Sequence, residues 1–353
     1  MAGASGSRPV TVGDALAEGA RRLAAAGCGE ARLDAELLLA HALGVSRACL
    51  FAHPERRLSA DQAASWQALI ERRAGREPIA YILGHKEFYG LDLLVDRRVL
   101  VPRPETELLV ERALQFAARH PVHTVWDVGT GSGAVALALA WHLRQAQVVA
   151  SDVSSAALQV AAANRRRLGL EGRVQLVRSD LLAAARGPID VVVANLPYLT
   201  AAERAQAMPE VSQYEPQVAL DGGPQGLALV GRLLRQAAAL DGPPALILVE
   251  IGARQGLPAV ALARESLPQA AVALQRDLAG LDRALEILPS GGETGYPPHP
   301  TLSPRGERGD LPHPALSPRG ERALAPSPSL RERAGVRVKS RNRAIVQLLR
   351  RAG

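Results

Sequence analysis

A glycine-rich turn joins an apolar run to a helical run near the middle of the chain. Residues 127–133 read DVGTGSG and continue directly into AVALALAWHL. Glycines permit positive φ angles and let a ligand approach the backbone, and the start of the following helix offers free N–H groups. The spacing differs from the dinucleotide fingerprint G-x-G-x-x-G, because the third glycine comes one residue early. Taken alone, such a turn is weak evidence for a ligand.

An acidic residue strengthens this evidence, because Asp152 ends the next apolar run. A carboxylate beside a glycine turn can bind both hydroxyls of a ribose, as it does in dinucleotide sites. The combination predicts nucleoside binding; the alternative is a tight turn next to a surface aspartate. Asp180, followed by Leu181, ends the run after that, where such folds often contact adenine. Asp180 could equally cap a helix over LLAAA.

A second motif, Asn195-Leu196-Pro197-Tyr198, follows the apolar run VVVA. Its place at the end of a central strand is where α/β sheets bind their ligands. An amide or aromatic amine nitrogen is a weak nucleophile because its lone pair is delocalised. The Asn195 amide oxygen and the Leu196 carbonyl could accept its N–H groups and stabilise the positive charge that develops during methyl transfer. Pro197 stiffens the turn, and the Tyr198 ring can pack against a planar amide or base. The alternative is an ordinary strand-to-loop turn.

The elements that position these residues are an alternation of strands and helices over residues 105–290. Helical segments separate most of seven β-like runs: HTVWDVG, QVVASDV, VQLVRSD, IDVVVANLPY, ALILVEIG, AVALQRD and RALEIL. This alternation predicts an α/β fold with a mostly parallel sheet.

Residues 10–80 predict a small bundle of amphipathic helices, with Ser59 as an N-cap and glycines 27, 44 and 75 at helix ends. Without visible catalytic groups, this part is either an adaptor for a protein partner or a passive stabilising lobe. Residues 81–104 predict a hairpin linker around the turn at 89–92.

The sequence changes character after residue 290. Segments 298–308 and 312–322 read PHPTLSPRGER and PHPALSPRGER, and such Pro- and Arg-rich repeats cannot bury enough apolar surface to fold. We expect residues 291–353 to be disordered and without a role in catalysis; a basic tail that touches RNA is the alternative. The last residues, AIVQLLRRA, could form a short helix.

Charge follows the same division. Residues 1–290 contain 30 Lys and Arg against 30 Asp and Glu, whereas residues 291–353 contain 12 against 5. The neutral larger part argues against a duplex-binding surface.

Cys28 and Cys49 cannot complete a zinc site, and we expect both to be reduced and no metal to be bound. There is neither a signal-peptide core nor an apolar run of membrane-spanning length, so we expect a cytoplasmic protein.

Several segments resemble one family. The D-x-G-x-G-x-G pattern of the glycine turn is that of class I methyltransferases. Residues 86–111, which contain PRPETE, are similar to the release factor glutamine methyltransferases (the PrmC/HemK family), and the resemblance covers most of residues 10–290. Further matching segments are YEP at 214–216, AL at 219–220, GG at 222–223, LVEIG at 248–252 and DLAGLDR at 277–283.

This resemblance implies a Rossmann-like seven-stranded sheet and a methyltransferase that acts on the glutamine of a Gly-Gly-Gln loop in peptide chain release factors. It implies that residues 10–80 help to dock the release factor, that 105–290 are catalytic, and that no nucleic acid, membrane or second subunit is needed. Asn195, Leu196, Pro197 and Tyr198 would hold the glutamine. S-adenosylmethionine would contact Gly129, Thr130, Gly131, Ser132, Gly133, Asp152, Asp180, Leu181 and Asn195.

One position departs from the family, which usually has Asn-Pro-Pro-Tyr where this chain has Leu196. The acceptor there is a main-chain carbonyl, which leucine also supplies, so we expect activity to be retained. Asn-Leu-Pro-Tyr also resembles the rRNA adenine dimethyltransferases. An adenine-N6 methyltransferase acting on DNA or rRNA is therefore the alternative enzyme. A non-catalytic binding protein is the third hypothesis, but it predicts damage to the glycine turn or Asn195, and both are intact.

Overall fold

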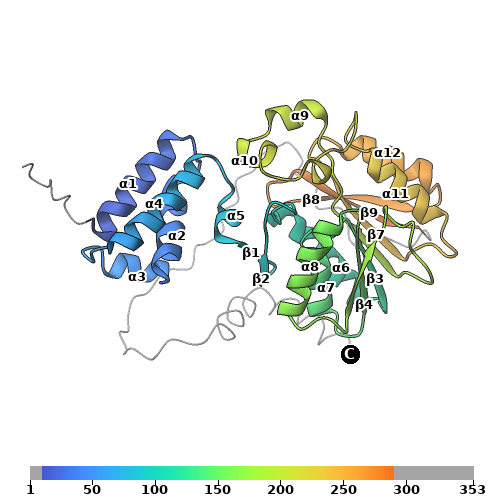
Figure 1. The fold of residues 1–353 in the computed structure, drawn as a ribbon. Coiled ribbons are helices and arrows are strands. Elements are labelled where there is room, and N and C mark those ends of the chain that lie inside the picture. Colours follow the sequence, from blue (N-terminus) through green and yellow to red (C-terminus); the bar gives the residue numbers. More distant parts are fainter. Residues whose placement is uncertain (1–9, 290–353) are drawn as a thin grey trace, which may run out of the picture.

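The computed structural model describes residues 10–289, which form a group of helices beside a larger α/β part (Figure 1). The expectations for residues 291–353 lie outside the described residues. Within residues 10–289, no helix is both long and apolar enough to cross a membrane. Both cysteines are free thiols, Cys28 buried and Cys49 partly exposed.

Three main helices form the N-terminal bundle: α1 (Val12–Ala25), α2 (Ala31–Leu43) and α4 (Ala60–Ala74). Ser59 caps α4 in a capping box, as predicted, and Gly44 ends α2 in the left-handed conformation. The bundle buries Leu23, Leu38 and Trp66 among other apolar side chains. Two short helices, α3 (Arg47–Ala52) and α5 (Ile79–Leu83), were not predicted, because a helix of five or six residues has too few turns to show a periodicity.

A hairpin follows, formed by β1 (His85–Phe88) and β2 (Leu91–Leu94). Its two turn residues, Tyr89 and Gly90, have φ angles of 49° and 79°. Positive φ at both positions matches the right-handed twist of the paired strands. The side chain of Asn164 exchanges hydrogen bonds with Leu94, donating to its carbonyl at 2.9 Å and accepting from its N–H at 2.7 Å. The hairpin is thereby attached to the α/β part.

The α/β part has a seven-stranded sheet, which confirms the predicted number of strands, and their order is β5-β4-β3-β6-β7-β9-β8. All neighbouring strands are parallel except β7–β9 and β9–β8. The strands are β3 (Thr124–Val128), β4 (Gln147–Asp152), β5 (Val174–Arg178), β6 (Val191–Ala194), β7 (Leu246–Glu250), β8 (Ala271–Arg276) and β9 (Asp282–Leu288).

Helices cover both faces of this sheet. The longer ones are α6 (Glu107–Ala117), α7 (Ala134–His142), α8 (Ser155–Arg167), α11 (Ala228–Ala238) and α12 (Gly256–Ser266). Short ones are η1 (Pro104–Thr106), α9 (Ala201–Gln206), α10 (Pro209–Ser212) and η2 (Gln217–Ala219). The possible helix over LLAAA at 181–185 does not form; residues 181–184 make turns instead.

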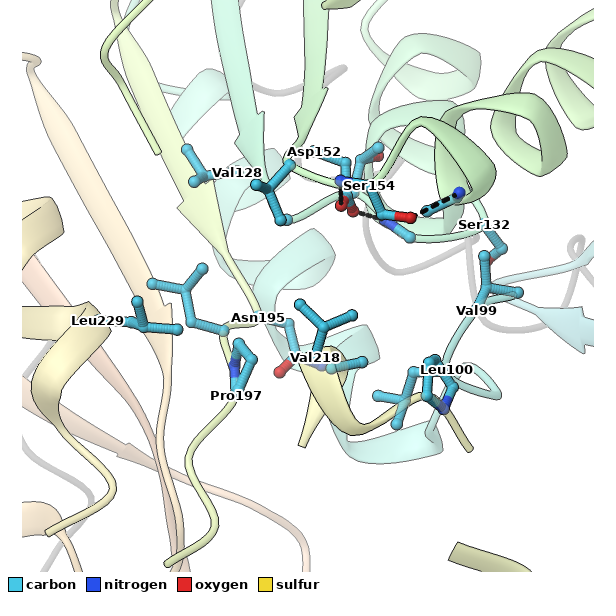
Figure 2. A pocket seen from close by; sticks show the side chains of 18 of the residues that line it. Val99, Leu100, Val128, Ser132, Asp152, Ser154, Asn195, Pro197, Val218 and Leu229 are labelled. Atoms are coloured by element: carbon cyan, nitrogen blue, oxygen red, sulfur yellow. Dashed lines mark hydrogen bonds between the residues drawn. The ribbon is translucent and has the colours of Figure 1, made fainter. Parts of the chain in front are cut away.

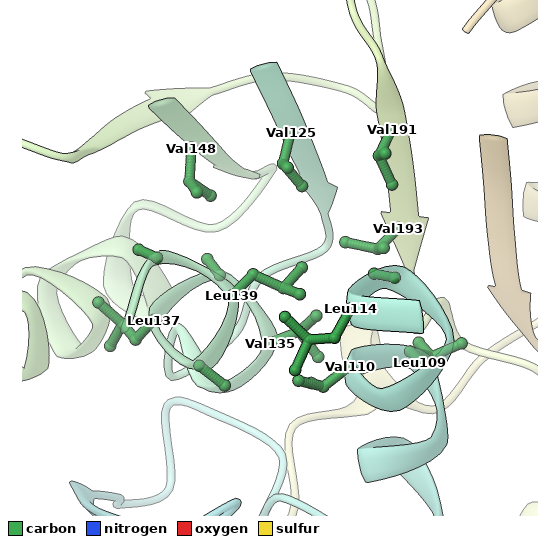
Figure 3. Packing of buried hydrophobic residues seen from close by; sticks show 14 of the residues in the cluster. Leu109, Val110, Leu114, Val125, Val135, Leu137, Leu139, Val148, Val191 and Val193 are labelled. Atoms are coloured by element: carbon green, nitrogen blue, oxygen red, sulfur yellow. The ribbon is translucent and has the colours of Figure 1, made fainter. Parts of the chain in front are cut away.

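Side chains alternate between the two faces of the central strands, which creates two cores. Val191 and Val193 of β6 pack with α6 and α7 (Figure 3), whereas Val192 and Ala194 belong to the core beneath α11 and α12. A strand buried on both faces becomes a continuous apolar run, which explains why VVVA is such a clear strand signal.

A carboxylate and a tyrosine hydroxyl attach the helical bundle to the α/β part. The Glu210 carboxylate, in α10, forms ion pairs with Arg73 at 2.9 Å and with Arg76 at 2.6 Å. Arg76 has a φ of 67°, an uncommon angle for a residue with a side chain. The hydroxyl of Tyr214 also donates to the Gly75 carbonyl at 2.6 Å. The end of α4 is thus fixed to the segment that follows the Asn-Leu-Pro-Tyr motif.

Candidate active site

Strand order brings the predicted motifs to one edge of the sheet. Strands β4 and β5 lie on one side of β3. The chain then crosses to the other side of β3 to form β6, so the strand order reverses at β3. Val128 of β3 is in register with both Ser151 of β4 and Ala194 of β6. The residues that follow each strand therefore lie side by side, at the switch point where α/β sheets bind ligands.

Left-handed glycines form the turn between β3 and α7. Gly129, Gly131 and Gly133 have φ angles of 75°, 56° and 86°. A Cβ atom on Gly133 would lie 2.9 Å from the Leu137 side chain. Any other residue at these positions would strain the backbone, and at Gly133 it would also press on the Leu137 side chain.

Asp127 supports this turn from below. Its Oδ2 accepts hydrogen bonds from the Thr130 hydroxyl at 2.6 Å and the Ala136 N–H at 3.1 Å. Burial raises the pKa of Asp127 to about 7, although these two hydrogen bonds act in the opposite direction. The first residue of the glycine motif thus connects the turn to the first turn of α7.

Asp152 lies at the end of β4 and faces the same turn. Its two oxygens accept from the Gly131 N–H at 2.9 Å and the Ser154 N–H at 2.8 Å (Figure 2). Burial raises its pKa despite these hydrogen bonds. A carboxylate has about four lone-pair positions, so both oxygens retain capacity for the hydroxyls of a ribose.

A cavity of about 550 Å³ opens over the ends of β3, β4 and β6 (Figure 2). This volume is in the range of small-molecule sites. Most of the predicted site residues line it: Gly129, Thr130, Gly131, Ser132, Asp152, Asp180, Leu181, Asn195, Leu196 and Pro197. Gly133 does not line it, since its place is beneath the turn, against Leu137 and Ala161. The carboxylate of Asp180 is paired with Arg232 at 2.5 Å.

A second cavity, of about 410 Å³, adjoins the first. Leu100, Asn195, Leu196 and Ala219 line both cavities. Tyr198, the remaining predicted residue, lines the second one only. Asn195 and Leu196 therefore form a wall between two spaces, which suits the transfer of a small group from a donor on one side to an acceptor on the other.

The backbone of this wall is held closely by the loop at 222–226. Gln255 donates from Nε2 to the Tyr198 carbonyl at 2.9 Å. A Cβ atom on Gly226 would lie 2.1 Å from that same carbonyl oxygen, and one on Gly222 would lie 2.7 Å from the Tyr198 Cα. These glycines allow the loop to pack directly on the motif.

No role was assigned from the sequence to two groups of interacting side chains beside the cavities: Arg103 and Glu250 line the second cavity, and Thr106 lines the first. Arg103 donates to Glu215 at 2.6 Å, which joins the PRPETE and YEP segments. Thr106 donates to Glu250 at 2.6 Å and accepts from Asn195 at 3.0 Å. All four of these residues, Arg103, Thr106, Glu215 and Glu250, lie in segments that resemble the family, so the resemblance could have marked them as candidates. No spacing rule predicts contacts between segments so far apart in the chain.

Metal chemistry receives no support from the described part of the chain: residues 10–289 contain no group of three or more His, Cys, Asp or Glu side chains placed to hold an ion.

Known proteins of similar sequence decide the family. The chain is 43% identical to a release factor glutamine methyltransferase from Moorella thermoacetica over 275 residues, which cover 78% of this chain and 97% of that protein. It is 42% identical to a protein of the same name from Cereibacter sphaeroides, covering 76% and 95% of the two chains. This chain belongs to the release factor glutamine methyltransferase family.

Two domain profiles and a solved structure agree with this membership. Residues 14–84 match the PrmC N-terminal domain, and residues 125–214 match a methyltransferase domain. The catalytic domain of hMettl16, solved in complex with the MAT2A 3'UTR hairpin 6, superposes with a TM-score of 0.50 at 16% identity, covering 65% of this chain and 84% of that one. At that identity the likeness shows the class I methyltransferase fold alone.

Proposed function

We propose that this protein transfers a methyl group from S-adenosylmethionine to the side-chain amide nitrogen, N5, of the glutamine in the Gly-Gly-Gln motif of peptide chain release factors. Family membership supports the reaction and the class of substrate. The observation that carries the site is the position of Asn195, which lies between two adjoining cavities.

S-adenosylmethionine would occupy the larger cavity, and when bound it supplies an electrophilic methyl group on a sulfonium. The cavity fits a nucleoside of this size, because the glycine turn leaves room at the backbone and Asp152 faces it with two partly used oxygens. Asp180 and Leu181 line the part where we expect adenine to bind.

The acceptor glutamine would enter the second cavity, beside Tyr198. The Asn195 amide oxygen and the Leu196 carbonyl would accept its two N–H groups and direct the nitrogen lone pair toward the methyl carbon. These acceptors stabilise the positive charge that grows on nitrogen, which is worth more in a site closed to water. Only the backbone of residue 196 is used, so leucine replaces the usual proline.

The helical bundle, residues 10–80, is proposed as the docking domain for the release factor, with 81–104 as a linker and 105–290 as the catalytic domain. The Glu210 ion pairs support this, since they connect the bundle to the segment whose Ala207, Met208 and Val211 line the second cavity. We further propose that the protein acts in the cytoplasm as a monomer, without nucleic acid or membrane.

The test is methyl transfer from labelled S-adenosylmethionine to a purified release factor, with DNA and rRNA in parallel reactions and mass spectrometry to locate the methyl group. We expect label on the Gly-Gly-Gln glutamine and none on a release factor in which this glutamine is replaced. Asn195→Ala should reduce the rate at least about 100-fold while some donor binding is retained. Label on adenine, with none on the release factor, would overturn the proposal in favour of a nucleic-acid methyltransferase.

A further inference from the structure

A short hydrogen-bonded chain runs from Asn195 into the protein interior. The Asn195 Nδ2 donates to the Thr106 hydroxyl oxygen at 3.0 Å, and that hydroxyl donates to the Glu250 carboxylate at 2.6 Å. Thr106 and Glu250 are only 4% and 3% exposed, although Thr106 borders the larger cavity and Glu250 the second one. The three residues come from separate elements, at the end of η1, after β6 and at the end of β7.

The direction of each hydrogen bond in this chain is determined by the carboxylate. An ionised carboxylate only accepts, so the single hydroxyl hydrogen of Thr106 must point to Glu250. The Thr106 oxygen is then left as an acceptor, and it can only be satisfied by the NH₂ side of the Asn195 amide. The opposite side of that amide, Oδ1, accepts no hydrogen bond from any residue between 10 and 289, and Asn195 lines both cavities.

We propose that Thr106 and Glu250 are positioning residues that fix the orientation of the Asn195 amide, so that Oδ1 rather than Nδ2 faces the N–H of the substrate glutamine. This inference rests on the proposed function. A reversed amide would place two donors against the donors of the substrate, which would remove one acceptor and add a repulsion. Thr106 thus selects between two orientations of nearly equal shape.

Protonation of Glu250 would reverse the chain, because a neutral carboxyl can donate to Thr106. The Thr106 hydrogen would then be free to point at Asn195 and attract Oδ1 away from the cavity. Burial raises the pKa of Glu250 to about 7, against the hydrogen bond from Thr106. The active orientation therefore belongs to the ionised form, and we expect the rate to fall as the pH drops through this pKa. The charged or titratable groups that face Glu250, or lie further along the same face of the sheet, are Arg103, Glu105, Arg112, Tyr198, Arg283 and Glu286.

The first test compares Thr106→Val, which keeps the shape and removes the hydroxyl, with Thr106→Ser, which keeps the hydroxyl. We expect Thr106→Val to lower kcat by about 10- to 100-fold, with the Kd for S-adenosylmethionine changed less than about twofold, and Thr106→Ser to restore most of the rate. Thr124→Val is the matched control, since Thr124 begins β3, at the end of the strand away from the site, and lines neither cavity. A wild-type kcat in Thr106→Val, or no recovery in Thr106→Ser, would overturn the proposal.

The second test is the pH profile of kcat in Glu250→Gln. We expect the loss of rate toward acid pH to disappear, because the glutamine cannot change its charge. Glu286→Gln is the control for removal of a buried carboxylate. Its kcat should still fall toward acid pH, since Glu286 is paired with Arg112 rather than with Thr106. An unchanged fall of kcat toward acid pH in Glu250→Gln would refute the role of Glu250.

A measurement without substrate separates this inference from the proposed function. In ¹⁵N-labelled protein, the Asn195 side-chain NH₂ should exchange slowly with solvent in the wild type and at least about 10-fold faster in Thr106→Val. If the wild type methylated no release factor, the proposed function would fail, and this exchange rate would still decide whether Thr106 holds Asn195. Equal exchange rates in the two proteins would refute the hydrogen bond itself.

Discussion

Replacement of Gly226 by alanine should slow methyl transfer by displacing the backbone of the Asn-Leu-Pro-Tyr motif. Gly226 has a φ of 71° and lies against the Tyr198 carbonyl. The new Cβ would be 2.1 Å from that oxygen and 2.3 Å from the Gln255 Nε2 that donates to it. The methyl group would therefore act on both partners of the hydrogen bond that holds the motif.

The size of the effect has two parts. The left-handed conformation costs an alanine about 1–2 kcal/mol. The contact must lengthen by about 0.9 Å to reach the 3.0 Å that real Cβ atoms keep, and overpacking of this kind costs about 1–3 kcal/mol. We expect a loss of about 2–5 kcal/mol in unfolding free energy. A displacement near 1 Å at the reacting groups costs on the order of 100-fold in rate.

Gly169→Ala is the matched control, because Gly169 has a φ of 68° and a Cβ there would meet no atom within 4 Å. It should lose only the conformational part of the stability and keep its kcat. Denaturant unfolding and single-turnover methyl transfer would measure the two effects. A Gly226→Ala protein with the rate of Gly169→Ala would refute the reasoning, since the contact with Tyr198 would then have no effect on catalysis.

Two further predictions concern the donor site and the attachment of the bundle. Asp152→Asn should raise the Kd for S-adenosylmethionine by about 10- to 100-fold in calorimetry, because charge-assisted hydrogen bonds contribute about 1.5–3 kcal/mol; an unchanged Kd would show that Asp152 does not bind the ribose. Glu210→Gln should lower the unfolding free energy by about 1–3 kcal/mol, because it removes the carboxylate of Arg76 and one of the two carboxylates of Arg73, which keeps Asp34, whereas Glu71→Gln, which changes an exposed pair, should have little effect. Although burial opposes it, hydrogen bonding to Arg76 and Arg73 lowers the pKa of Glu210, so its contribution should be present near neutral pH and lost as the pH falls below the usual value of 4.5; a pH-independent difference between wild type and Glu210→Gln would contradict this sign.

The sequence determined the local features of this protein. The seven strands and the three long N-terminal helices were visible because their apolar residues recur with the period of the element, and a strand buried on both faces is a continuous apolar run. The glycine turn and Asn195 could be located at one end of the sheet because each follows directly after a strand, so their position along the chain also gives their position in a parallel sheet.

Only the tertiary structure determined which groups act together at the site. Thr106 and Glu250 are 144 residues apart, and Arg103 and Glu215 are 112 apart, yet both pairs are in hydrogen-bonding contact. No periodicity connects them, because their meeting depends on strand order and on how the loops fold over the sheet edge. The possible helix after Asp180 does not form, for a related reason. A run such as LLAAA has the propensity for a helix, but here a turn places its apolar side chains in the core. Local pattern thus determined the elements and pointed to the first residues of the candidate site, and packing between distant segments decided which residues they contact.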